Sequence, residues 1–453
     1  MRKQNLFFIW ILLICCCWLS PAIQAQEEEA ADKPKWNEFR LNEDVTLGVN
    51  GYLYLYHIRN ANCYHTERNA AFTEISAGLG FDLNIRDEIS GQIRWVGTGL
   101  YGRPDNYLLT PSAEMDTFVD LANMTWHNRW ESNSLHITAG LQELIYGDGF
   151  LIMDGYSETR AIWTTPIRSF PALKASLEVG DDLVVDAFTA HIRDTFLSQE
   201  ALLGSGTTFA TGGSLHGFNL HSTCCPETVL DFGVFVKEED GNTMTKSDTV
   251  ALSIRGEKKI NQFTLTGELV REYGQTNVVE GAVTNNNINR RAWGGHLTGR
   301  LDLSDSGLKP YVKARYTYFG GDADSSTKTS EAFDPMFFGW NDWGQWWIGD
   351  MTSFSVPHSN ARILTGETGL TLTDMSTLRI FYFNTQLLRT QNFSNSKHWS
   401  HEVNVVYDYD LGGGAFTGLM AGAARPARAA EQFNAVNHGR VNYELIAWMG
   451  FAF

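Results

Sequence analysis

The sequence predicts an all-β protein: a single transmembrane, antiparallel, up-and-down β-barrel of about 18 strands, with short periplasmic turns and long extracellular loops. Three observations predict this fold. Apolar and polar residues alternate with a period of two in segments of about 10 to 14 residues, the connections between segments alternate between short and long, and the last segment is amphipathic and aromatic. No stretch shows helical periodicity over a length that would suit a core helix.

The composition limits what the chain can bind. Its 453 residues carry 35 Lys and Arg against 52 Asp and Glu, which gives a formal net charge of -17. This acidic balance argues against a nucleic-acid partner, because binding to phosphates depends on clustered basic residues. Aromatic residues make up 13% of the chain, which argues against disorder. A chain of this length often contains several soluble domains, but an all-β chain can form one unit.

Residues 1–25 have the features of a secretory signal peptide. Arg2 and Lys3 precede a short apolar run and a small-residue cleavage site. The run is shorter than the roughly 18 to 20 apolar residues that a membrane-spanning helix needs, which favours cleavage over an uncleaved anchor. We therefore expect an exported protein with an acidic, flexible lead at residues 26–42 and a β-barrel at residues 43–453.

Three cysteines remain after such a cleavage, namely Cys63, Cys224 and Cys225. Their number and spacing match neither a disulfide framework nor a zinc site. Cys224 and Cys225 form either a vicinal disulfide or a pair of small side chains at a turn before Pro226. No cofactor motif occurs in the chain, so we expect neither a metal nor a cofactor.

The clearest strand extends from Thr73 to Arg86. Its apolar side chains occupy every second position up to Ile85, and polar side chains such as Glu74 and Asp82 occupy positions between them. Such a strand has one face suited to hydrocarbon and one suited to water. Counting all runs of this kind places strand starts near residues 46, 72, 88, 117, 134, 172, 182, 212, 228, 248, 260, 290, 308, 360, 376, 398, 414 and 440.

The connections between these strands alternate strictly in length. The short ones lie around residues 86–87, 180–181, 259, 304–307, 374–375 and 411–413. The long ones lie near residues 100–116, 143–171, 194–211, 273–289, 321–359 and 425–439. A soluble β-sandwich has no reason to keep every second loop short, whereas an outer-membrane barrel has short periplasmic turns, long extracellular loops and an even strand number. The pattern of loop lengths therefore predicts that the protein is located in the outer membrane of a Gram-negative bacterium.

The C-terminal segment, residues 441–453, gives the sharpest local signal. One face of it carries Tyr443, Leu445, Ala447, Met449, Phe451 and Phe453. This ending is similar to the terminal strand that insertion machinery recognises in outer-membrane barrels, so we expect the machinery to bind the strand that ends at Phe453. Outer-membrane lipid and lipopolysaccharide are the partners expected for the outer face. Tyrosines near strand ends suit interfacial girdles, among them Tyr52, Tyr54, Tyr56, Tyr316, Tyr318, Tyr407 and Tyr409.

Three stretches carry a family resemblance. Residues 140–149 read Gly-Leu-Gln-Glu-Leu-Ile-Tyr-Gly-Asp-Gly, residues 333–335 read Phe-Asp-Pro and precede an aromatic run to Trp340, and His401 and Glu402 begin a late strand. In order and spacing these stretches resemble the alginate export family of outer-membrane porins, whose first motif reads Gly-Arg-Gln-Glu-Leu-x-Tyr-Gly-Asp. The resemblance covers most of the chain. It implies a barrel of about 18 strands whose lumen passes polysaccharide or small polar solutes.

The chain departs from this family at Leu141, where the family motif commonly has Arg. Alginate-conducting members have an arginine-rich lumen that attracts an anionic polymer. Taking the polar face of each strand as the lumen face, we expect a pore lined by Arg94, Lys174, Arg255, Arg300, Lys313, Arg315, Arg379, Glu367 and Glu402. Further carboxylates share these faces, so the expected lumen is mixed and leans acidic. Either these charges select solutes, or opposite charges on neighbouring strands, such as Arg255 and Glu268, pair and stiffen the wall.

The loop at residues 321–359 contains the most unusual stretch of the chain. Its candidate sugar-binding residues are Trp340, Trp343, Trp346 and Trp347. Sugar rings stack on aromatic faces that lie beside amide and carboxylate groups, so this loop either binds carbohydrate or constricts the pore. The alternative is an apolar cluster that keeps the loop folded over the barrel mouth.

No catalytic site is expected. His358 and Ser359 are adjacent, so their side chains would point to opposite faces of a strand and would not converge. Glu143, Asp148 and Asp154 could offer oxygen ligands to Ca²⁺, but their spacing matches no calcium motif.

The sequence therefore predicts a non-enzymatic outer-membrane channel. Its expected cargo is polysaccharide, oligosaccharide or small polar solutes, which pass by passive diffusion. The alternative is a surface-displayed carbohydrate-binding protein whose barrel is an anchor plugged by the loop at residues 321–359. Conductance would separate the two.

Overall fold

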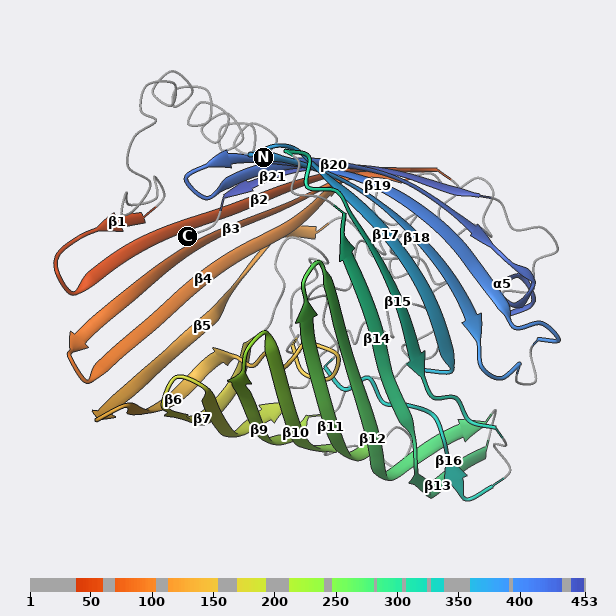
Figure 1. Ribbon diagram of the computed structural model, residues 1–453, viewed down its shortest axis with the longest axis horizontal. Helices are drawn as coiled ribbons and strands as arrows, with labels where there is room; N and C mark the ends of the chain where they lie inside the picture. The colour runs from red at the N-terminus through yellow and green to blue at the C-terminus, as the bar shows by residue number, and fades with distance from the viewer. Residues whose placement is uncertain are drawn as a thin grey trace. The chain divides into compact units, whose positions relative to one another are not determined.

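The computed structural model describes residues 38–59, 70–102, 113–153, 169–192, 212–239, 247–280, 283–303, 307–323, 327–337, 359–390, 394–433 and 441–451. Within these ranges the chain forms a closed, antiparallel β-barrel (Figure 1). Residues 1–37, which include the expected signal peptide, and the C-terminal Phe453 lie outside the described residues.

The wall consists of 18 strands that follow one another in chain order. They are β2 (Val45–Arg59), β3 (Ala70–Arg86), β4 (Ile89–Gly102), β5 (Ala113–Trp130), β6 (Asn133–Glu143), β7 (Ser169–Val179), β8 (Leu183–Ile192), β9 (Gly213–Cys225), β10 (Thr228–Glu239), β11 (Ser247–Ile260), β12 (Phe263–Glu280), β14 (Trp293–Asp302), β15 (Tyr311–Phe319), β17 (Ala361–Thr373), β18 (Ser376–Leu387), β19 (His398–Gly412), β20 (Ala415–Pro426) and β21 (Asn442–Phe451). The predicted strand number is confirmed, and every predicted start lies within about four residues of an observed one.

The first and last strands of the wall close the barrel. β2 pairs with β21 from Gly51 opposite Phe451 to Arg59 opposite Tyr443. Closure leaves no wall strand with an unpaired edge, which is the condition for strands to cross hydrocarbon. The predicted up-and-down barrel is therefore confirmed.

Shorter elements lie outside the wall. β1 (Glu38–Arg40) pairs with β2 and falls at the end of the stretch expected to be a flexible lead. β13 (Val283–Arg290) pairs with the end of β12 and, in parallel, with β16 (Thr329–Ser330). The helix α5 (Arg428–Phe433) precedes β21. No helix among the described residues is long and apolar enough to span a membrane.

The connections alternate in length as predicted. Two residues join β5 to β6, β9 to β10, and β11 to β12, and Glu131, Glu227 and Asn261 have positive φ values of 52°, 54° and 54° in these turns. In the first and third of these turns the positive φ stands at the first loop residue, as in primed hairpin turns, whose twist matches that of the flanking strands. In the β9–β10 turn it stands at Glu227, after Pro226, whose ring fixes its own φ at a negative value, so this turn is not a primed one. The turn at Pro226 is the one expected after Cys224 and Cys225, and the Cys225 side chain is exposed there.

The two faces of the wall have opposite polarity. Large apolar side chains such as Leu79, Ile254 and Leu297 are exposed, whereas Glu74 and Ser76, on the other face of β3, are buried. This is the reverse of a soluble β protein and suits an outer surface in contact with lipid. The exposed face of β21 carries the apolar residues predicted for it, including Tyr443, Leu445 and Met449.

The tyrosines expected in interfacial girdles divide between the faces. Tyr316 and Tyr318 are exposed on the outer face. Tyr56 is instead buried on the inner face, where it stacks on Phe72 at 4.4 Å and donates a hydrogen bond to Glu74 (3.1 Å). The expectation was wrong for Tyr56, and also for Tyr52 and Tyr54 on the same face, because the leucines of β2 occupy its outward positions.

Candidate functional site

A segment that follows β6 turns into the barrel. Residues 144–153 bring the Asp148 carboxylate within 2.8 Å of the Arg255 guanidinium on β11. Neighbouring strands lie about 4.8 Å apart, so five spacings along the wall separate β6 from β11 by roughly 24 Å. The segment therefore crosses the interior to reach Arg255. We call residues 144–153 the first inward segment.

Two glycines let the first inward segment turn back on itself. Gly147 and Gly149 have φ values of 57° and 78°, a region that residues with a Cβ rarely adopt. A Cβ on Gly149 would lie 2.5 Å from the sulfur of Met153. The Gly149 N–H donates to the Tyr146 carbonyl (3.0 Å), and the Tyr146 N–H donates to the Ile152 carbonyl (3.1 Å).

A second segment, residues 327–337, meets the first. The Phe337 N–H donates to the Leu151 carbonyl (2.8 Å), and the Met153 N–H donates to the Phe337 carbonyl (2.9 Å). These bonds form an isolated parallel bridge between Ile152 and Phe337. We call residues 327–337 the second inward segment and the two together the inward loop pair. The pair joins the loop after β6 to the loop after β15.

Aromatic rings pack the inward loop pair against the wall. Phe150 lies 5.3 Å from Phe319 of β15 and 5.5 Å from Phe333, measured between ring centroids. Tyr146 stacks on Phe188 of β8 at 5.4 Å. Burial raises the pKa of Tyr146 well above its ordinary value, so its hydroxyl stays neutral. Burying each such ring contributes about 1.5–3 kcal/mol, which holds the loops in place.

Arg255 is the centre of one charged cluster. Its guanidinium contacts Asp148 (2.8 Å), Asp231 (3.0 Å) and Glu257 (3.0 Å). The His296 ring lies 3.4 Å from the other oxygen of Asp148. His221 also contacts Asp231 (2.6 Å). With both histidines counted as neutral, three carboxylates around one guanidinium give this part of the interior a formal excess of negative charge. We call these residues the Arg255 cluster.

Asp334 of the second inward segment is the centre of a second charged cluster. Its carboxylate contacts Lys237 (2.7 Å) and Arg290 (3.1 Å) and accepts a hydrogen bond from Thr249 (2.8 Å). Its N–H donates to Glu272 (2.9 Å). Burial alone would raise the pKa of Asp334, but Lys237 and Arg290 hold it well below its usual range. The carboxylate is therefore charged at neutral pH, and it anchors the segment to β10 and β13.

The residues expected to line the pore occupy positions on the inner face of the wall. The salt bridges of these residues are Arg94 with Asp120 (2.5 Å), Lys174 with Asp186 (2.9 Å), Arg300 with Asp302 (2.9 Å), Lys313 with Glu367 (3.6 Å) and Arg379 with Asp408 (2.6 Å). Arg315 donates to Thr298 (2.7 Å), and Glu402 accepts from Asn404 (2.5 Å). Contact of these residues with a solute stays a prediction.

The ion pair between Arg255 and Glu268, which the sequence suggested, does not form in the structure. Arg255 and Glu268 are direct cross-strand partners of β11 and β12. The guanidinium nevertheless bonds to the cluster described above, and Glu268 accepts from the Ser253 hydroxyl (2.7 Å). The reason is that the first inward segment brings Asp148 to Arg255, which no cross-strand pattern reveals.

Other residues singled out from the sequence do not form a site. Glu143 reaches Arg94 (3.4 Å) while Asp148 bonds to Arg255, so the two carboxylates point to different partners. No group of three or more His, Cys, Asp or Glu side chains in the described ranges is arranged to hold a metal ion. Outside those ranges lie Asp154, His358, Trp340, Trp343, Trp346 and Trp347.

Sequence reasoning missed the first inward segment, its contact with the second and the anchors Lys237, Arg290 and His296, although the second segment lies in the loop at residues 321–359 that was offered as a pore constriction. The available signals were the Tyr-Gly-Asp-Gly run at residues 146–149 and the Phe-Asp-Pro run at residues 333–335. Both belong to the family-like stretches, but neither has a periodicity that would locate it inside the barrel.

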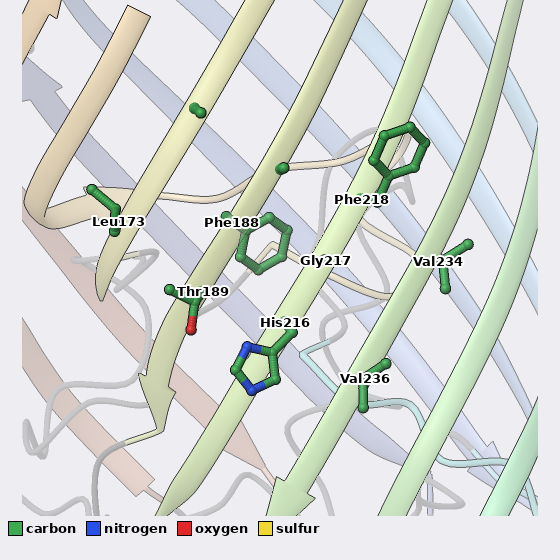
Figure 2. A pocket seen from close by; sticks show the side chains of 10 residues that line it. Leu173, Phe188, Thr189, His216, Gly217, Phe218, Val234 and Val236 are labelled. Carbon is green, nitrogen blue, oxygen red and sulfur yellow. The ribbon is translucent and has the colours of Figure 1, made fainter.

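An apolar groove of about 480 Å³ lies on the wall where β7 to β10 run side by side (Figure 2). Leu173 and Phe218 in its lining are exposed, whereas Lys174 and Asn219, their chain neighbours, are on the inner face. The groove therefore faces the hydrocarbon and is no part of the lumen.

No protein-family model matches the sequence, and no curated protein matches it. Solved structures do. Pseudomonas aeruginosa OpdQ has a TM-score of 0.54 at 11% identity, over 90% of this chain and 99% of that one. OccK5 (OpdH), from the same organism, has a TM-score of 0.53 at 11% identity, over 90% of this chain and 98% of that one. OpdK from that organism, crystallised with vanillate, has a TM-score of 0.52 at 11% identity, over 90% of this chain and 98% of that one. These proteins are outer-membrane porins with 18-strand barrels, and this chain shares their fold.

Proposed function

We propose that the protein is a passive outer-membrane channel for small polar solutes, with the inward loop pair as the element that limits solute size. The observation that carries this proposal is the hydrogen-bonded contact between the two inward segments inside a closed barrel. A wide barrel narrowed by internal loops can sieve solutes, because pore width and lining charges set what passes. The fold shared with porins favours the same function.

The charges of the lumen favour neutral or cationic solutes. Basic side chains such as Arg94, Lys174 and Arg255 are each held by carboxylates, so their charge is offset where it would attract an anion. The Arg255 cluster has a carboxylate excess, which would raise the local concentration of cations. We extend the proposal to neutral and amino-bearing oligosaccharides as cargo, in keeping with the saccharide cargo implied by the family resemblance. An anionic polymer such as alginate fits this lumen less well.

The second candidate is a surface-displayed carbohydrate-binding protein in which the barrel is only an anchor. The observation that favours it is the dense packing of Phe150, Phe319 and Phe333 at the inward loop pair. A barrel filled in this way would conduct few ions.

Single-channel conductance in a planar bilayer tests these proposals. The refolded chain is expected to give steady openings that favour cations. Neutral and amino-bearing oligosaccharides should interrupt the current, whereas alginate oligomers and vanillate, an aromatic carboxylate, should not. Block by the anionic compounds alone would overturn the proposed cargo, and the absence of conductance in a correctly folded barrel would favour the surface binder.

A further inference from the structure

Four polar side chains lie together on the inner face of the strands that close the barrel. They are Glu402 and Asn404 of β19 and Asn442 and Glu444 of β21. Each is at most 3% exposed. None belongs to the inward loop pair or to either charged cluster described above.

The strand between them leaves space for their side chains. β20 lies between β19 and β21, and its register places Ala424 between Glu402 and Asn442. The next inward row has Gly422 in the corresponding position, between Asn404 and Glu444. Two strand spacings amount to roughly 10 Å, which longer side chains can bridge over a residue as small as alanine or glycine.

Glu444 and Asn442 have no hydrogen-bond partner within the described ranges. Both carboxylate oxygens of Glu444 and both polar atoms of the Asn442 amide are buried and make no hydrogen bond. An amide and a carboxylate two residues apart on one strand face could bond to each other directly, and they do not. Burying such groups without a partner costs several kcal/mol, so a buried polar group in this condition points to a bound water or ion.

The surroundings exclude bulk solvent from these groups. Val406, Met420 and Ile446 form the next inward row and are fully buried. On the other side α5 packs against β19 and β20, with Ala429 and Ala430 buried. Bulk water is therefore a poor source of hydrogen bonds here.

We propose that Glu444 and Asn442, together with Glu402 and Asn404, bind a hard divalent cation of the Ca²⁺ class. Carboxylate and amide oxygens are the ligands that Ca²⁺ takes in proteins, and two carboxylates match its charge. The Asn404 amide donates to Glu402 Oε1 (2.5 Å), which orients that carboxylate. Ionised together, Glu402 and Glu444 would repel each other across β20, and a cation between them would turn this repulsion into attraction. The ion would join β19 to β21 across β20, next to the seam with β2.

The competing explanation is that Glu444 binds a proton. A protonated carboxyl is a strong donor and would seek an acceptor such as the Asn442 carbonyl, yet no such hydrogen bond exists. The proposal depends on the fold and these side chains, and it is independent of the cargo proposed above.

Terbium luminescence on the full chain refolded in detergent micelles tests the proposal. Tb³⁺ takes Ca²⁺ sites and is excited by nearby tryptophan, here Trp399, three residues before Glu402 on β19. One saturable site that Ca²⁺ displaces is expected, together with a rise of several degrees in the unfolding temperature when Ca²⁺ is added. Glu444→Gln should lose the site and the temperature shift.

Asp82→Asn is the matched control, because Asp82 is another carboxylate of an inner strand face and is bonded to Gln92 (3.0 Å). Asp82→Asn should keep both the Tb³⁺ luminescence and the rise in unfolding temperature.

If Glu444→Gln does not refold, Asn442→Leu serves instead and should weaken Tb³⁺ and Ca²⁺ binding at least tenfold. Glu444→Gln that keeps the site, or a folded wild-type chain without a Ca²⁺-displaceable site, would overturn the proposal.

Discussion

Asp148 joins the first inward segment to the wall through the Arg255 cluster. Both partners of this ion pair are nearly buried, with side-chain exposures of 11% for Arg255 and 9% for Asp148. Removing one partner of such a pair is costly, because the other charge stays buried with fewer partners. The pair is therefore both a structural anchor and part of the negative charge of the lumen.

Asp148→Asn should weaken both roles. It keeps the size of the side chain but removes the charge, so we expect a loss of about 1.5–3 kcal/mol in the free energy of unfolding. The cation preference of the channel should also fall. Urea unfolding in micelles and the reversal potential across a salt gradient measure the two effects. The control is Glu143→Gln, an exposed partner of Arg94, for which we expect less than about 0.5 kcal/mol. Equal effects of the two substitutions would contradict the role of Asp148.

Asp334 predicts how stability depends on pH. Its pKa is lowered in the folded chain, so its contribution is complete above the ordinary aspartate pKa of about 3.9 and is lost as the pH falls towards the lower folded value. The unfolding free energy should therefore have an acid-side decline below about pH 4 that is shallower in Asp334→Asn. Unfolding curves between neutral and strongly acid pH measure this. Identical slopes for the two proteins would show that Asp334 does not contribute.

Residue contacts were only partly predictable. The sequence indicated which side chains face inward, because alternation assigns every second residue of a strand to one face. It did not indicate the partners of Arg255, since Asp148 is 107 positions away and arrives through an irregular segment. Local pairs such as Lys313 with Glu367 lie opposite each other in neighbouring strands, and patterns of that kind can be found once the register is known.

At the scale of elements, strands and inward segments differ in what specifies them. Strand bounds follow from a period of two over many residues, and slipping the register by one would turn apolar side chains into the lumen. The first inward segment has no period, and it depends on two glycines with positive φ and on packing across the barrel. For this reason the strands were predicted closely and the first inward segment was not, whereas a pore constriction was one of the alternatives left open for the loop at residues 321–359, which contains the second inward segment.

Gly149→Ala should disturb the first inward segment. The added Cβ would meet Met153 at 2.5 Å, and the residue would keep a positive φ, so we expect a loss of about 1–3 kcal/mol and noisier single-channel current. Gly180→Ala is the matched control: its φ is 60°, but a Cβ there has nothing within 4 Å. The difference in stability loss between the two variants therefore measures the effect of the contact between the added Cβ and Met153. If both substitutions have the same effect on stability and current noise, the inward turn does not depend on close packing at Gly149.

The whole molecule is defined by its polarity, with an apolar exterior around a charged interior. Leu297 in the middle of β14 is 56% exposed, and Leu303 just beyond the end of that strand is 48% exposed. In water these values would be unfavourable, but in lipid they are the expected arrangement. The overall architecture was the feature that the sequence predicted best, because the alternation of apolar and polar residues, the loop lengths and the terminal strand all indicate the same barrel.

Arginine substitutions on the outer face should depend on depth. Leu297→Arg places a charge near the centre of the hydrocarbon and should reduce the free energy of folding into vesicles by roughly 2–4 kcal/mol. Leu303→Arg, near the periplasmic boundary, should cost about 0–1 kcal/mol. Denaturant titrations in vesicles, with the gel shift between boiled and unboiled samples, measure both. Similar costs at the two positions would contradict the assigned membrane depth.

The seam between β2 and β21 also fixes the order of events during biogenesis. Gly51 and Phe451 are partners although about 400 residues separate them in the chain, so contacts of this kind form late and slowly. Until β21 is made and delivered, β2 and β20 are strands with an unsatisfied edge that can pair with other chains. We therefore expect that the chain must be kept from aggregating until the barrel closes. Quality control of this protein would act on open-edged intermediates, because the finished barrel has no such edge to recognise.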